Sequence, residues 1–156
     1  MKWLSLGLAG VLALSLPATA AVADPCQVIR AVLNDQRDDL GDLVASGDPA
    51  RGPVATTLTL PGYDCSIRSV VGLGVLRCER AFGARGEALT EIAAFKPGVE
   101  ACVAATEASQ HLGEAGPNVL YSGVVSHPYS AVVTISIIDT SQGGGGYTVR
   151  IEATRT

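Results

Sequence analysis

The residues with the most distinctive chemistry in this chain are its four cysteines, Cys26, Cys65, Cys78 and Cys102. An even number of cysteines in a chain of this length is typical of exported proteins, in which the thiols pair as disulfides. Zinc is the competing use, but the sequence has no C-x-x-C and its cysteine spacings fit no common zinc module. We therefore expect two disulfides, with three connectivities open, and neither a metal nor a cofactor.

Few other side chains offer catalysis. His111 and His127 both fall in expected loops, and Ser126 beside His127 lacks the G-x-S-x-G turn of a serine hydrolase. A glycoside hydrolase would need two carboxylates held about 5–9 Å apart in a cleft. The candidate carboxylates, on one expected helix, are Glu87, Glu91, Glu100 and Glu107. We expect no assembled catalytic site, and a small exported hydrolase using carboxylates or His127 is the alternative.

A group of aspartates near the start of the chain is the only candidate for cation binding. It comprises Asp35, Asp38, Asp39 and Asp42, which share one side if the segment is helical. The group would then form a cation site or an acidic recognition face. A solvated helix face is the simpler explanation and is the interpretation that we favour.

The first 23 residues predict a secretory signal. A basic start is followed by an apolar stretch from Leu4 to Leu16 and then by small residues ending in Ala21-Val22-Ala23. A membrane anchor would need about 17–25 apolar residues, which is longer than this stretch. We expect cleavage after Ala23, with Ala20 less favoured, to leave residues 24–156 as one periplasmic or secreted domain.

The charge of residues 24–156 limits the class of partner. This segment contains ten basic and fifteen acidic side chains, whereas nucleic-acid binding requires a basic surface. We expect no nucleic-acid binding and no membrane insertion. A periplasmic or extracellular protein is the expected partner, and the sequence also allows a homodimer.

Apolar residues at intervals of three and four predict two helices. The first begins at Asp24-Pro25, where an N-cap precedes proline, and is expected over 24–47. The second is expected over 89–103 as one helix that is kinked by Pro97. Its buried stripe includes Cys102, within reach of a sheet.

Alternating and β-branched residues predict the strands. Expected strands cover 54–60, 65–71, 75–82, 130–139 and 147–154, with a short strand or irregular structure over 118–125. The glycines indicate a three-residue turn at Gly72-Leu73-Gly74, which would place Cys65 and Cys78 on one face without facing each other. A direct bridge between these two cysteines would instead need a two-residue turn at Val71-Gly72. We therefore favour strand-to-helix disulfides.

The order of these elements predicts an α+β domain. An antiparallel sheet of about five strands would carry both helices on one face, in the order α-βββ-α-ββ. This order looks like that of type III secretion chaperones, which is an analogy of layout and carries no function.

Four short motifs resemble parts of small exported proteobacterial domains that contain cysteines and have no characterised function. The motifs are LPGYDCSI (60–67), LRCERAF (76–82), VEAC (99–102) and SHPY (126–129). They are structural rather than catalytic, so the resemblance implies export and disulfides but no activity. The sequence as a whole favours a non-catalytic protein-binding or accessory protein.

Overall fold

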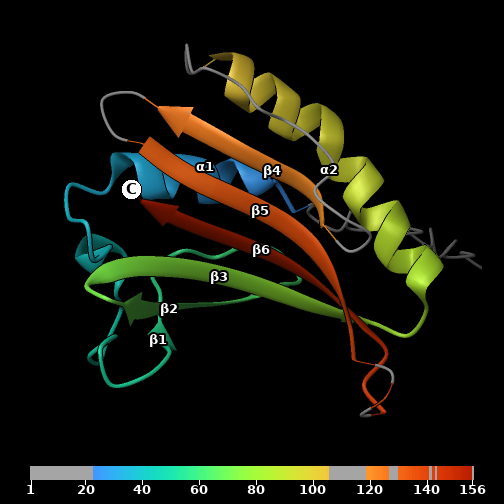
Figure 1. Cartoon of the computed structure of the whole chain (residues 1–156), viewed down its shortest axis with the longest axis horizontal. Helices are drawn as coiled ribbons and strands as arrows, with labels where there is room; N and C mark the ends of the chain where they lie inside the picture. The colour runs from blue at the N-terminus through green and yellow to red at the C-terminus, as the bar shows by residue number, and fades with distance from the viewer. Residues whose placement is uncertain (1–22, 106–118, 127–129, 141, 143, 156) are drawn as a thin grey trace, which may run out of the picture.

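An antiparallel sheet with the strand order β1-β2-β3-β6-β5-β4 carries the fold (Figure 1). The computed structural model describes residues 23–105, 119–126, 130–140, 142 and 144–155. Its strands are β1 (Val54–Ala55), β2 (Asp64–Val70), β3 (Leu73–Phe82), β4 (Val119–Ser126), β5 (Ser130–Asp139) and β6 (Tyr147–Arg155). Its helices are α1 (Pro25–Asn34), the short 3-10 helix η1 (Gly41–Leu43) and α2 (Arg85–Ala105). The predicted α+β class and the order of helices and strands are confirmed.

Both long helices cover the same face of the sheet. Helix α1 packs on β5 and β6, and α2 packs on β3, β5 and β6. In Figure 1, α1 runs behind β4, β5 and β6. On β6, Val149, Ile151 and Ala153 are fully buried, which reflects the alternation of a strand with one covered face. Burial of each large apolar side chain stabilises the fold by about 1.5–3 kcal/mol.

The disulfides differ from the predicted strand-to-helix pairs. Cys26 pairs with Cys102 and links the two helices, and Cys65 pairs with Cys78 across β2 and β3. All four cysteines are therefore paired, as the sequence predicted, but the predicted connectivity is wrong. The helix stripe that carries Cys102 faces α1 as well as the sheet, so the nearest cysteine is on the other helix.

The first helix is shorter than predicted. Asp24 caps it by accepting a hydrogen bond from the Cys26 amide at 3.0 Å, as expected of an N-cap. The helix ends before Asp35, whose extended backbone and carboxylate, bonded to the Arg37 amide at 2.8 Å, form a turn. The prediction of a helix over 24–47 is therefore wrong beyond Asn34.

The observed strands and α2 test several further predictions of element bounds. The strand expected over 54–60 contains only the two residues of β1. The helix that contains Pro97 is one continuous element, and the segment left open over 118–125 contains β4. Residues 1–22 of the expected signal segment, His111 and His127 lie outside the described residues.

A polar cluster fastens α2 to the hairpin of β2 and β3. The Tyr63 hydroxyl donates to Glu91 Oε1 at 3.2 Å, and Arg80 Nη1 donates to the same oxygen at 3.0 Å. Tyr63 is 8% exposed and its ring lies 6.0 Å from that of Phe95. Burial, followed by the charge of Glu91 and the hydrogen bond to it, raises the pKa of Tyr63 above its ordinary value.

This shift predicts a loss of stability at alkaline pH. A phenol whose pKa is higher in the folded state keeps its proton more tightly when folded, so its contribution is complete below the unfolded pKa of about 10 and is lost above it. The free energy of unfolding, measured in urea between about pH 9 and pH 11, should therefore fall more steeply with pH for the wild type than for Tyr63→Phe. Equal slopes for the wild type and Tyr63→Phe would refute the shift.

Candidate functional site

The hairpin of β2 and β3 ends in a tighter turn than the glycines suggested. Val70 pairs directly with Leu73, which leaves Val71 and Gly72 as a two-residue connection. Their φ angles are +53° and +83°, the two positive values of a type I′ turn. The predicted three-residue turn at Gly72-Leu73-Gly74 is therefore wrong. The two-residue turn places Cys65 directly opposite Cys78, with 4.0 Å between their Cα atoms.

The end of this hairpin is apolar and exposed. We call Val70, Val71, Gly72 and Leu73 the apolar tip. Val71 is 98% exposed, Val70 42% and Leu73 38%. A Cβ placed on Gly72 would meet no atom within 4 Å, so the tip projects from the surface. It lies at the left of Figure 1, where β2 ends and β3 begins.

Val71 is an unfavourable residue for the conformation that it adopts. Left-handed backbone costs about 1–2 kcal/mol for a residue with a Cβ, and a β-branched side chain is among the least suited to it. Type I′ turns strongly prefer Asn, Asp or Gly at this position. Because Val71 is almost completely exposed, burial within the domain does not offset that cost. Stability of the isolated domain does not explain this residue.

The apolar tip is held rigidly from below. The Cys65–Cys78 disulfide closes the base of the hairpin, and β3 pairs with β6 from Val75 onward. The tip therefore extends past the described pairing of β6. A closed hairpin loses little conformational entropy when it binds, which favours recognition by a preformed shape.

A loop forms backbone hydrogen bonds with both edges of the hairpin just below the tip. We call residues 35–53 the flanking loop. The Gly74 amide donates to the Asp38 carbonyl at 2.8 Å, and the Ser69 amide donates to the Pro49 carbonyl at 2.9 Å. Ser69 and Gly74 face each other in the ladder, so the two bonds hold opposite edges. Gly74 is required there because a Cβ would collide with the backbone of Asp39.

The four predicted aspartates lie in the flanking loop rather than on a helix. Asp39 forms two hydrogen bonds with Arg37, at 3.0 and 2.8 Å, and accepts a third from the Gly41 amide. The hydrogen bond from Arg37 is the main reason why the pKa of Asp39 is lowered. No three His, Cys, Asp or Glu side chains converge on a metal position among the described residues. The expected shared face of a helix does not exist here.

Arg155 is a buried residue of this region that sequence reasoning missed. It is 3% exposed, donates to the Asp35 carbonyl at the end of α1, and lies 3.5 Å from Asp38 Oδ1. A cation is favourable there because helix carbonyls concentrate negative charge at that end. Its position in the alternation of β6, after Val149, Ile151 and Ala153, was the signal that could have placed it inside.

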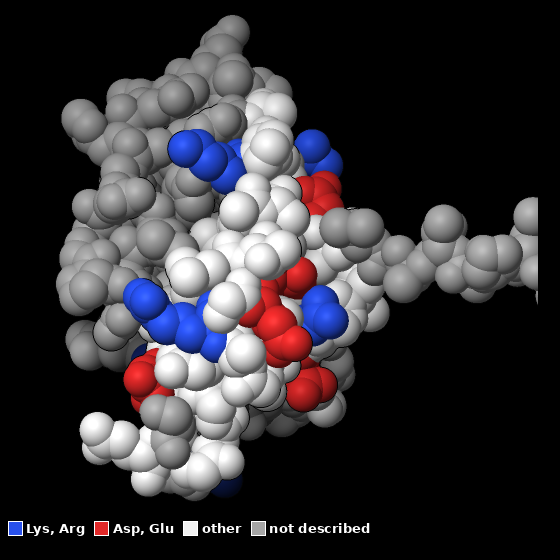
Figure 2. Space-filling model, turned by 90° about the vertical axis from the view of Figure 1, so that its right-hand side faces the viewer, with Lys and Arg blue, Asp and Glu red and all other residues white. Residues whose placement is uncertain are grey.

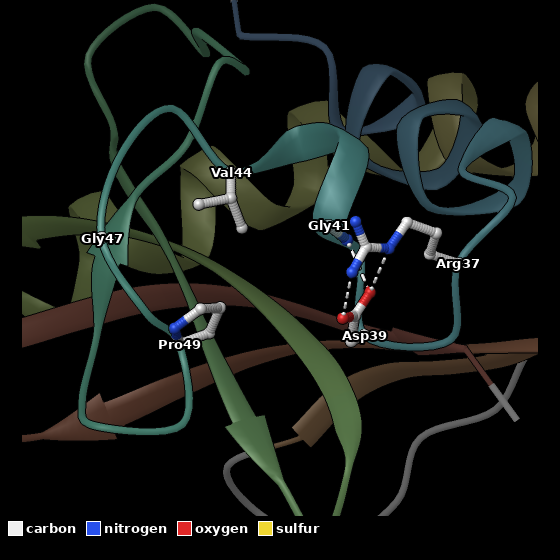
Figure 3. Close-up of a pocket in the computed structure, with 6 residues that line it drawn as sticks. All are labelled: Arg37, Asp39, Gly41, Val44, Gly47 and Pro49. Atoms are coloured by element: carbon white, nitrogen blue, oxygen red, sulfur yellow. Dashed lines mark hydrogen bonds and ion pairs between the residues drawn. The ribbon is translucent and has the colours of Figure 1, made fainter.

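A small hollow lies within the flanking loop (Figure 3). Its volume is about 170 Å³, and its walls come from Arg37, Asp39, Gly41, Val44, Gly47 and Pro49. Ligand pockets usually hold about 300–1,000 Å³. Figure 3 shows the Arg37 and Asp39 side chains bonded to each other rather than presented to a ligand. This hollow does not provide a small-molecule site.

The described carboxylates of the hydrolase alternative already hold other groups. Glu87 accepts from the Ala84 amide at 3.2 Å, and Glu91 binds Tyr63 and Arg80. Glu107 and both histidines lie outside the described residues, as does the side chain of Glu100. The alternative therefore stays a prediction that gains no support from Glu87 or Glu91.

Charges of both signs are interspersed on the surface. On the sheet face opposite the helices, Arg77 pairs with Glu152 at 2.7 Å and Arg150 pairs with Glu79 at 2.5 Å. Figure 2 shows acidic and basic side chains alternating among the described residues on the side where β3 leads into α2. Neither surface has the single-sign basic character that a nucleic-acid site requires.

Comparisons with protein-family models, curated proteins and solved structures gave no significant match. In the described part of the chain, neither helix combines the length and apolar character that a membrane span requires. The candidate site therefore rests on geometry alone, and the apolar tip is its best-defined feature.

The unfavourable conformation of Val71 predicts a stabilising substitution. Val71→Asn should raise the free energy of unfolding by about 1 kcal/mol because asparagine tolerates left-handed backbone and loses little burial here. Val70→Asn is the matched control in a regular strand and should be neutral or destabilising, since asparagine disfavours strands. Urea unfolding of both variants tests this. Equal destabilisation by the two substitutions would refute the proposed turn.

Proposed function

We propose that this protein is a non-catalytic, exported protein-binding domain that contacts its partner through the apolar tip. The observation that carries the proposal is Val71, which is 98% exposed in a backbone conformation that disfavours valine. Unfavourable local conformations persist where function requires them. Burial of this side chain in a partner would contribute about 1.5–3 kcal/mol, enough to offset the local cost.

The two disulfides support the export part of this proposal. They fit an oxidising environment such as the periplasm or the cell exterior. The expected signal segment, cleaved after Ala23, would deliver the chain to that environment. Exposed apolar side chains on a stapled hairpin would be available to a partner there without prior rearrangement.

A photocrosslinking experiment tests the tip as the contact site. A photoreactive phenylalanine at Leu73, which lies in regular strand beside the turn, should form a discrete adduct with another exported protein in cells that export this chain. Adding Val71→Asn should reduce the adduct by about tenfold, because the lost burial is worth at least about 1.4 kcal/mol. Excess unlabelled wild type should compete, and the Val71→Asn chain should not.

The control is the same probe at Gln142, an exposed residue in the loop between β5 and β6 at the other end of the sheet. It should give no such adduct. The proposal fails if Leu73 forms no adduct, or if Val71→Asn leaves the adduct unchanged. An adduct that contains only two copies of this chain would make the protein a homodimer and would overturn the proposal of a separate partner.

A further inference from the structure

We infer that the partner surface is an apolar cleft of a protein whose rim carries Lys and Arg side chains. This inference rests on the proposed function and specifies the chemistry of the partner. Its basis is the charge and shape around the apolar tip. Lipid and protein surfaces differ in how well they complement that charge and shape.

The tip is convex, so its receiving surface must be concave. Val71 and Gly72 have almost no neighbours, and Val70 and Leu73 are partly exposed on the two strands below them. Three apolar side chains form a small contact, which a cleft can surround more completely than a flat surface can. Well-packed, desolvated pockets are the sites where a few side chains dominate binding.

The composition of the tip disfavours a lipid bilayer as its target. Proteins that anchor at membrane interfaces use Trp and Tyr rings and basic side chains for contact with headgroups. Residues 69–74 read Ser-Val-Val-Gly-Leu-Gly and contain neither kind. A valine- and leucine-only tip is better suited to an apolar protein cleft.

The flanking loop surrounds the tip with an excess of acidic side chains. Residues 35–53 contain five aspartates and two arginines. Acids still outnumber bases when Arg68 and Arg155 are included. Asp38 and Asp42 carry the outward part of this excess: the Asp38 side chain is 76% exposed beside Arg155, which is only 3% exposed, and Asp42 is also exposed. Two of the other acids form ion pairs whose bases are more exposed, with Arg37 at 59% against 43% for Asp39, and Arg51 at 87% against 54% for Asp48.

The electrostatic surroundings of Arg37 agree with this excess of acidic side chains. The pKa of Arg37 is raised first by its hydrogen bond to Asp39 and then by the charge of Asp39, with smaller contributions from Asp42 and Asp35. Asp48 is also partly exposed, with 54% of its side chain accessible. An acidic surround repels anionic headgroups and attracts a basic rim.

The position of the flanking loop brings these charges into the contact. Hydrogen bonds from Ser69 to Pro49 and from Gly74 to Asp38 fix the loop one ladder pair below the tip. A cleft that encloses Val71 would therefore bring its rim close to the aspartates. The charged rim of the partner then orients the two proteins and speeds their association, whereas its apolar cleft contributes most of the affinity.

Salt dependence of the Leu73 photoadduct tests this inference in the full chain. The adduct should weaken as sodium chloride rises from about 50 mM to about 500 mM, because exposed charges are screened over that range. Asp48→Asn should lower the adduct by about twofold to fivefold at low salt and have little effect at high salt. Asparagine keeps the oxygen that accepts from the Ala50 amide, so the loop turn is preserved.

The matched control is Asp64→Asn, which removes an exposed charge at the other end of the hairpin and should leave the adduct unchanged. An adduct that ignores both salt and Asp48→Asn would overturn the basic rim and leave the proposed function standing. Absence of any adduct would overturn both.

Vesicle flotation provides the competing outcome. The purified wild type should not float with phosphatidylcholine vesicles, nor with vesicles that also contain phosphatidylglycerol. Flotation of the wild type that is lost in Val71→Asn would identify lipid as the target of the tip and overturn the inference.

Discussion

The register of β2 against β3 is the constraint on which the rest of this structure depends. Cys65 faces Cys78 in a directly opposed pair, and the disulfide between them locks that pairing covalently. Because side chains alternate along a strand, a shift by one residue would move Ile67 and Leu76 out of the core. The same register places the turn at Val71-Gly72 and so determines which side chains project from the surface.

The flanking loop depends on this register as well. Ser69 and Gly74 turn their amides away from each other, and the loop accepts both hydrogen bonds. Gly74 admits the backbone of Asp39 at a distance that no side chain would allow. The charges of the loop and the apolar tip are therefore positioned by one hairpin, so shape and electrostatics at this end of the molecule are coupled.

Sequence patterns predicted the elements better than the connections between them. The N-cap at Asp24, the helix through Pro97 and the alternation of β5 and β6 follow from local rules, and the structure contains them. The apolar periodicity around Leu40 and Val44 suggested a longer helix, because a loop that buries Leu40 has the same spacing. The turn was misplaced because glycine indicates turns, whereas Val71 adopts the conformation that glycine favours. The candidate site is therefore the place where a local rule fails, which is where function is expected.

The pairing of β2 with β3 in solution tests this account most directly. In a non-hydrogen-bonded antiparallel pair the Cα atoms lie about 4.5 Å apart, close enough for Hα–Hα contacts in nuclear Overhauser spectra. We predict such contacts for Cys65 with Cys78, Ile67 with Leu76 and Ser69 with Gly74. Contacts displaced by one residue along either strand would abolish the two-residue turn at Val71-Gly72 and contradict the account.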